Sequence, residues 1–283
     1  MDYIIGLLTI IAIFTLLTQS YNLVLGFAGQ FHLAHIAFMG IGAYTFGLLA
    51  VKADWPFLIA MLAGGIMALI AGVFLGKITL PFKGPYLVII SYGFTEIAKS
   101  IELNWIDLTN GSRGLLGVPR PSFFGFELYH PLGFLIFTLV VVIIGHYLMH
   151  RIISSPYGLL LEALREDEIA VETTGRSTVR IKMEVMAVSA FFAGLAGALF
   201  VSYLSIITPE DYGLPAVILI LLMVLLGGKG SFWGGGILGT VAIYVIFEPL
   251  RFLDLPDSVL GSLRMLIYAV LFILLMLLRP QGL

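Results

Sequence analysis

Polar and ionisable side chains interrupt two long apolar stretches of this chain, and these are the residues that could handle a polar solute. The first group is Asn22, Gln30, His32 and His35, and the second is Ser91, Tyr92, Thr95, Glu96 and Lys99. Such residues are costly inside a membrane and usually face a bundle interior or a water-filled path. We therefore interpret Asn22, Gln30, His35, Ser91, Tyr92 and Glu96 as lining a translocation path. The alternative is that they only hold helices together.

Two pairs in these groups have the i, i+3 spacing that places side chains on one helix face. Glu96 and Lys99 can neutralise each other there, either as a structural ion pair or as a functional site. His32 and His35 could share a metal ion, but a metal site needs further ligands and no third ligand lies near them in the sequence. We expect histidines that are hydrogen-bonded in helix packing, and no metal site.

Catalytic motifs are not found in the sequence. The chain has no cysteine and no Ser/His/Asp or HExxH arrangement. The segment Gly72–Lys77 resembles a phosphate-binding loop, but it is one residue short and lacks the Ser or Thr after the lysine. A net charge of −2 does not favour nucleic acid as a partner. We expect neither an enzyme nor a cofactor.

The elements that position these residues are membrane helices. Of 283 residues, 60% are hydrophobic and 11% charged, whereas soluble domains are roughly 45–50% apolar and about 25% charged. Glycine is abundant, as in closely packed or broken membrane helices. The fold class is therefore all-α, a polytopic membrane helix bundle with 8–10 transmembrane helices in a single domain, 1–283. The expected spans are 3–20, 33–51, 57–76, 85–103, 131–150, 181–206, 214–228, 233–251 and 260–279.

The distribution of charge predicts the orientation. If 151–184 is cytoplasmic, the segments on that side hold nine Lys and Arg residues, against five on the other side. Because positive residues are enriched in cytoplasmic loops, we expect the 151–184 loop and the C-terminus to be cytoplasmic and the N-terminus external.

The polar segment 151–184 has the pattern of one or two short amphipathic helices. Ser155 and Pro156 have the types expected at a helix N-cap and first position. Apolar residues then recur at helical spacing, and Gly175 can end a helix in a left-handed conformation. The segment is interpreted as a docking element for a cytoplasmic partner, or alternatively as a solvated connector or interfacial helix.

A short pattern, L-G-x-x-G-[Q/S]-F, occurs twice, at 25–31 and at 226–232. Each copy follows an apolar span and precedes another. Paired glycine-interrupted helices in two halves of a chain point to a transport site, and here they suggest an internal repeat with parallel copies. Chance is the alternative, because glycine and leucine are common here. Small-residue ladders such as Gly72/Gly76 and Gly194/Ala198 indicate close helix contacts, within the chain or between subunits.

Taken in order, several blocks of the chain resemble the M-type permease subunit of the branched-chain amino-acid ABC importers of bacteria and archaea. The blocks are Tyr21–Gln30, Leu33–Phe38, Gly40–Tyr44, Lys83–Tyr86, Gly93–Ile97, Leu108–Leu115, Ala163–Ala170 with Gly175, Leu225–Ser231 and Arg279–Leu283. Arg113 and His32 depart from the residue types usual in that family, which bears on the substrate.

This resemblance implies a coupling helix within 151–184 that docks on an ATPase subunit. The residues it assigns to coupling are Glu162, Ala163, Arg165, Glu166, Asp167, Glu168 and Gly175. It also implies an H-type permease partner in a heterodimer, two ATP-binding cassette subunits, and an extracellular or periplasmic solute-binding protein. The expected location is the inner or plasma membrane, with several passes through the bilayer.

The resulting expectation is a permease subunit of an ATP-driven importer for Leu, Ile and Val or a related small polar solute such as urea or a short amide. ATP hydrolysis is expected on the partner subunits. Two alternatives stay open: an ion-coupled secondary transporter that uses Glu96, and a structural membrane protein without a transport role.

Overall fold

The computed structural model describes residues 2–79, 82, 84–123, 126–127, 130–248 and 257–278. The block 279–283 and the expected cytoplasmic C-terminus lie outside the described residues. In the described part, each of the nine predicted spans contains a helix, and the helix ends fall close to the predicted boundaries. The prediction of a polytopic helix bundle is confirmed.

The helices are α1 (Asp2–Asn22), α2 (His35–Gly47), α3 (Phe57–Thr79), α4 (Pro85–Asn104), α5 (Ile106–Thr109), α6 (Pro131–Ile153), α7 (Pro156–Glu166), α8 (Glu168–Thr173), α9 (Thr178–Leu204), α10 (Leu214–Gly227), α11 (Gly239–Phe247) and α12 (Asp257–Leu278). Three π-helical segments continue or precede them, η1 (Leu23–Phe27), η2 (Leu48–Lys52) and η5 (Gly234–Leu238). Two 3-10 turns are η3 (Gly111–Arg113) and η4 (Pro209–Tyr212), and the strands are β1 (Leu115–Leu116), β2 (Ser122–Phe123), β3 (Phe126–Glu127) and β4 (Ile206–Ile207).

Five helical stretches of the described chain are long and apolar enough to cross a membrane: Asp2–Phe27, His35–Lys52, Phe57–Thr79, Pro131–Ile153 and Thr178–Leu204. Shorter apolar helices are Leu214–Gly227, Gly234–Phe247 and Gly261–Leu274. Helix α4 has the length of a span but carries Glu96, Lys99 and Glu102. It is the most polar of the expected spans.

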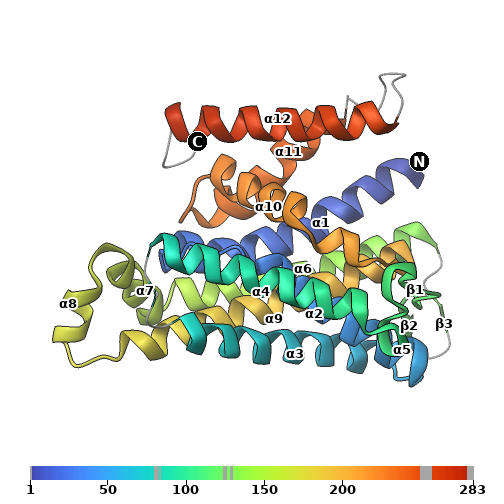
Figure 1. The fold of residues 1–283 in the computed structure, drawn as a ribbon, viewed down its shortest axis with the longest axis horizontal. Helices are drawn as coiled ribbons and strands as arrows, with labels where there is room; N and C mark the ends of the chain where they lie inside the picture. The colour runs from blue at the N-terminus through green and yellow to red at the C-terminus, as the bar shows by residue number, and fades with distance from the viewer. Residues whose placement is uncertain are drawn as a thin grey trace.

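Helix α9 is the centre of the bundle, and α2 and α3 pack along it (Figure 1). Glycines allow the close approach: a Cβ on Gly42 would lie 2.3 Å from the Cα of Gly194, and one on Gly72 would lie 2.7 Å from the Cβ of Ala190. Lipid-embedded helices gain little hydrophobic energy from association, so small residues that permit dense packing stabilise them instead. These small-residue ladders therefore make contacts within the chain.

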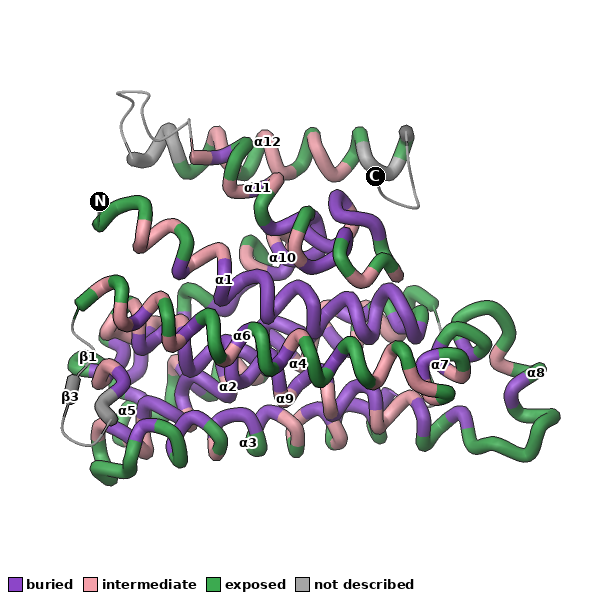
Figure 2. The backbone as a smooth tube through the Cα atoms, turned by 180° about the vertical axis from the view of Figure 1, so that it is seen from behind, coloured by how far each residue is buried: buried purple, intermediate pink, exposed green. Residues whose placement is uncertain are grey.

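The bundle has two distinct ends (Figures 1 and 2). At one, which we call the β end, α5, η3 and the strands lie near the start of α1, and β1 pairs antiparallel with β4. At the other, the α7 end, α7 and α8 project beyond the long helices. Exposed residues follow the outer faces of α3, α4 and α12, whereas α9 is mostly buried (Figure 2).

Candidate functional site

The two copies of the glycine pattern lie against each other in the structure. Helix α1 continues as the π-helical η1, and no helix follows until α2. The last residues of η1 and the non-helical residues after it form the first break, residues 26–34. Helix α10 ends at Gly227, and the second break, residues 228–231, follows it. A Cβ on Gly26 would lie 2.3 Å from the backbone N of Gly230. The breaks meet at the α7 end, on the same side of the molecule, as parallel copies require. That they form a true internal repeat remains a prediction.

Asn22 joins the two breaks. Its Nδ2 donates to the Ser231 carbonyl oxygen at 2.9 Å, and its Oδ1 accepts from the Gly230 amide, also at 2.9 Å. The side chain is fully buried. Backbone groups freed by a broken helix need a partner inside a membrane protein. Asn22 is the partner of two such groups in the second break, the Gly230 N–H and the Ser231 carbonyl oxygen.

Arg165 of α7 reaches the same junction. Its Nη1 donates to the Gly26 carbonyl oxygen at 2.9 Å. Its side chain also occupies the space beside two glycines in the left-handed region, Gly29 (φ +68°) and Gly230 (φ +80°). A Cβ would lie 2.8 Å from Arg165 Cγ at Gly29 and 2.9 Å from Arg165 Nη1 at Gly230. One side chain thus connects α7 with both breaks.

Local sequence explains why α7 and α8 hold this position. Ser155 Oγ accepts from the Tyr157 amide at 3.2 Å, and Pro156 follows it at the first helical position. Asp167 Oδ1 accepts from the amides of Ile169 and Ala170 and so caps α8. Gly175 then has φ +77°, after the end of α8. The prediction of one or two short amphipathic helices, with an N-cap at Ser155 and a glycine stop at Gly175, is confirmed, and the structure has two.

The residues assigned to coupling differ in their surroundings. Glu162, Ala163 and Gly175 are exposed. Glu166 accepts from Arg165 Nη2 at 2.9 Å, and Glu168 forms an ion pair with Lys182. Glu168 therefore connects α8 to α9, whereas Glu162 and Ala163 lie on the exposed surface of α7.

Two exposed apolar side chains on α7 and α8 were missed from the sequence. Leu159 is 69% exposed and Ile169 is 70% exposed. The buried face of the loop is formed instead by Leu161, Leu164 and Val171. Leu159 lies two positions before the buried Leu161 in α7, and Ile169 lies two positions before the buried Val171 in α8, so each is on the far side of its own helix and the spacing carried the signal.

Four of the six predicted path residues are buried within this chain. Besides Asn22, the Nε2 of His35 lies 2.9 Å from Ser20 Oγ, and Ser91 Oγ accepts from the Leu33 amide at 2.9 Å. Gln30 is also buried; its backbone N–H donates to the Val24 carbonyl oxygen at 3.0 Å, and its side-chain Nε2 has no hydrogen-bond partner among the described residues. Tyr21 stacks on His35 with ring centroids 4.8 Å apart, so that histidine is a packing residue. The described residues contain no group of three metal-ligating side chains.

The other two predicted path residues, Tyr92 and Glu96, lie on the outer face of α4. Tyr92 is half-buried, and Glu96 is exposed. The expected pair of Glu96 with Lys99 is wrong, because Lys99 Nζ lies 3.3 Å from Glu210 Oε2. The long lysine side chain reaches η4, which packs on that end of α4. Glu96 therefore faces outward from this chain without that cation.

Comparison with known proteins gives the family. Residues 3–278 match a family model described as branched-chain amino acid transport system / permease component. The chain is 33% identical, over 302 residues, to the high-affinity branched-chain amino acid transport system permease protein LivM of Escherichia coli. That match covers 99% of this chain and 69% of the relative.

Two further relatives are more distant. A probable branched-chain amino acid transport permease protein LivM of Methanocaldococcus jannaschii is 25% identical over 234 residues, covering 80% of this chain and 67% of the relative. The ribose import permease protein RbsC of Haemophilus influenzae is 30% identical over 138 residues, covering 47% of this chain and 41% of the relative. No solved structure matches the chain. With a family model matched over nearly its whole length, the chain belongs to the family of permease components of branched-chain amino acid transport systems.

Proposed function

We propose that this chain is the transmembrane permease subunit of an ATP-driven importer for branched-chain amino acids. Its partners are a second, H-type permease, two ATP-binding cassette subunits and an external solute-binding protein. The relatives that are named as branched-chain amino acid permeases support the substrate class. The 283 residues act as one permease domain, and ATP is hydrolysed on the partner subunits.

The observation that carries the mechanism is the contact of Arg165 with the glycine breaks. Arg165 Nη1 donates to the Gly26 carbonyl oxygen at 2.9 Å, and Gly26 packs on the second break. A displacement of α7 therefore changes a hydrogen bond at the point where α1 and α10 both end. Packed elements shift between discrete arrangements, so a moving α7 can open or close the bundle at this junction.

The surface that receives the ATPase is formed by exposed residues of α7 and α8. Leu159 and Ile169 are apolar side chains without cover, and Glu162 and Ala163 lie on the same two-helix loop. Exposed apolar side chains rimmed by charges are typical of protein–protein contacts. In this proposal Arg165 transmits movement from α7 to the bundle, and Leu159 and Ile169 contact the ATPase.

The outer face of α4 supports a path between two permease subunits. An ionised carboxylate on a lipid-facing surface is costly, so intramembrane acids face protein or water. Glu96, near the middle of α4, is exposed on the outer surface of this chain. A second permease subunit against α4 would place Tyr92 and Glu96 at the shared path, with Asn22 and Gln30 supporting the broken helices behind it.

Transport then follows from the two ends of the bundle. The binding protein delivers the amino acid at the β end, where the loop 104–130 is external. The ATPases act at the α7 end, which is cytoplasmic in this orientation. The chain provides polar groups along a path and a junction that moves, rather than a tight binding site.

Purification of the native complex, with identification of its subunits by mass spectrometry, tests the assignment. Two Walker-motif ATPases and a second permease should co-purify, and leucine uptake into liposomes should require ATP. Leu159→Asp combined with Ile169→Asp should release the ATPases, whereas Val179→Asp, an exposed apolar position on α9, should not. A chain that purifies alone and moves leucine without ATP, with transport that an uncoupler abolishes and Glu96→Gln impairs, would establish a secondary transporter instead.

A further inference from the structure

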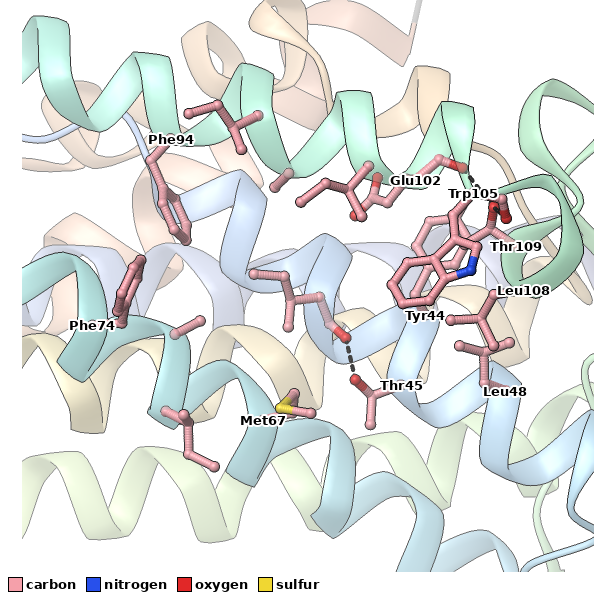
Figure 3. A pocket seen from close by; sticks show the side chains of 16 residues that line it. Tyr44, Thr45, Leu48, Met67, Phe74, Phe94, Glu102, Trp105, Leu108 and Thr109 are labelled. Atoms are coloured by element: carbon pink, nitrogen blue, oxygen red, sulfur yellow. Dashed lines mark hydrogen bonds between the residues drawn. The ribbon is translucent and has the colours of Figure 1, made fainter.

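A cavity of about 610 Å³ lies between α2, α3 and α4 toward the β end (Figure 3). Its walls are mostly apolar and include Ile41, Leu48 and Phe94. Its mouth is formed by side chains that point away from the bundle, such as Ile70, Phe74 and Ile97, which are more than half exposed. The cavity therefore opens sideways, through the surface that faces the membrane or a neighbouring subunit. Its volume is in the range of small-molecule sites, roughly 300–1,000 Å³.

A carboxyl group lies in this apolar cavity. Glu102 is only 6% exposed, and its Oε2 is buried without a hydrogen-bond partner among the described residues. Thr109 Oγ1 donates to the Glu102 backbone carbonyl at 2.7 Å and so fixes this turn of α4 (Figure 3). A buried carboxyl oxygen without a hydrogen-bond partner is destabilising, so a water or a ligand group bound at this oxygen would stabilise the site.

Two tyrosine hydroxyls from residues that neighbour Glu102 are likewise buried without a hydrogen-bond partner among the described residues. Tyr44 lines the cavity and Tyr212 of η4 stands behind it, with their ring centroids 6.3 Å apart. Both hydroxyls are buried and lack partners among the described residues. Burial raises the pKa of the Tyr212 phenol well above its usual range, and the nearby Glu102 raises that pKa further. Tyr212 therefore keeps its proton.

Gly40 makes the space for this arrangement. A Cβ at position 40 would lie 3.0 Å from Glu102 Oε1 and 3.0 Å from Tyr212 Cγ. Glu102 and Tyr212 both pack over the same bare stretch of α2 backbone. The carboxyl and the phenol are thus held together by the fold. The nearby Lys99 also attracts the Glu102 carboxyl, although its ammonium group lies in an ion pair with Glu210.

From this geometry, we propose that the cavity binds a primary ammonium group carried on an apolar body. The ammonium donates hydrogen bonds to the Glu102 carboxylate and to the Tyr44 oxygen, and the Tyr44 ring adds cation–π attraction. The apolar body fills the space lined by Ile41, Leu48 and Phe94. A buried water would satisfy hydrogen bonds but would neither compensate the charge nor fill an apolar cavity of this size.

Two sources supply this chemistry: the amino group of an apolar amino acid, and an amine from the bilayer such as an aminophospholipid or a fatty amine. The first source rests on the proposed transport function, and the second does not. Glu102 on α4 would in either case act as the group that selects a cation.

Tryptophan fluorescence of the full chain in phosphatidylcholine nanodiscs tests the proposal. Trp105 lines the cavity, so Trp55→Phe and Trp233→Phe leave Trp105 as the reporter among three tryptophans. Titration with n-hexylammonium should give a saturable change, and 1-hexanol, with the same apolar body and no charge, should bind about tenfold more weakly or worse, since a charge-assisted hydrogen bond is lost.

The variant Glu102→Gln should abolish the preference for the amine over the alcohol. Asp107→Asn, an exposed acid at the same end of the bundle, should leave it unchanged. If Glu102→Gln does not fold, Tyr44→Phe gives a second test and should reduce the preference. Equal responses to amine and alcohol, or a preference that survives both substitutions, would overturn the proposal and leave an ordered water as the partner of Glu102.

Competition against n-hexylammonium separates the two sources. Displacement by L-leucine would assign the site to the transported amino acid. Displacement by phosphatidylethanolamine in the nanodisc, and not by leucine, would assign it to a bilayer amine. Both outcomes require the ammonium site, and neither needs the ATPase partners, so failure here is distinct from failure of the importer assignment.

Discussion

Three polar side chains at the α7 end bond to the backbone of the two breaks. Asn22 bonds the second break, Arg165 bonds the first, and Ser91 bonds the Leu33 amide at the end of the first break. In a membrane protein, irregular backbone persists only where protein or water satisfies it. These residues are therefore the reason that two helices can stop at the same place.

Replacement of Asn22 by Ala should destabilise the protein. Two backbone groups of the second break, the Gly230 amide and the Ser231 carbonyl, would lose their partner, at a cost of about 1–3 kcal/mol for each group left unsatisfied. The unfolding midpoint in detergent should fall. Asn104→Ala is the control, because the exposed Asn104 bonds only within its own helix, and an equal shift in both variants would contradict this role of Asn22.

At the scale of elements, the spans follow from apolar length alone. Each predicted span contains a helix because a stretch of about 20 apolar residues must satisfy its own backbone in lipid. The caps of α7 and α8 were readable in the same way, since Ser155, Asp167 and Gly175 act through local backbone bonds. Local chemistry was therefore predictable from the sequence.

The contacts between elements were not predictable in this way. The family resemblance placed Arg165 in the coupling segment, but no spacing within α7 shows that this partly exposed side chain reaches the Gly26 carbonyl oxygen of another helix. The burial of the Glu102 carboxyl could not be foreseen, because it depends on the packing of α2 and η4 against α4. Such arrangements depend on how distant segments pack together, and the spacing of residues within one helix does not give that information.

Packing of α9 against its neighbours makes a prediction for glycine substitutions. A Cβ on Gly194 would lie 2.6 Å from Ala68 Cβ and 2.9 Å from the Gly64 carbonyl oxygen. Gly194→Ala should therefore destabilise the bundle by about 1–3 kcal/mol, the usual cost of overpacking. Thermal unfolding or the monodisperse fraction in detergent would report it.

Gly93 provides the matched control for that substitution. It also lies in a predicted span, but a Cβ on Gly93 would have no other atom within 4 Å. Gly93→Ala should be neutral or stabilise α4 by roughly 0.5–1 kcal/mol, because alanine loses less conformational freedom in a helix. If Gly194→Ala were tolerated as well as Gly93→Ala, α9 would not be packed as tightly as described.

At the scale of the whole molecule, α4 is a helix with an uncovered face. Ile89 and Glu96 lie two helical turns apart on that face, and both are exposed. An acid cannot be left facing lipid at small cost, so we expect another subunit there. The isolated chain is in this sense an incomplete membrane protein.

Site-specific cross-linking tests where the second permease lies. The chain has no cysteine, so Ile89→Cys provides a single attachment point for a thiol-reactive photo-crosslinker. Illumination of the native complex should join this chain to the partner permease. Ile143→Cys on α6, which is similarly exposed, should yield lipid adducts only, and the reverse pattern would move the interface to α6.

Coupling in the reconstituted complex with Arg165→Ala is the most direct test of how α7 acts on the bundle. The substitution removes the hydrogen bond to Gly26 and leaves Leu159 and Ile169 in place. The ATPases should therefore stay bound and hydrolyse ATP. Leucine uptake should fall about tenfold or more, because a charged hydrogen bond contributes roughly 1.5–3 kcal/mol. Glu166→Gln, which keeps the Gly26 contact, should retain most of the uptake. Uptake that remains normal in Arg165→Ala, or ATPases that dissociate from it, would contradict the claim that this side chain transmits movement from α7 to the glycine breaks.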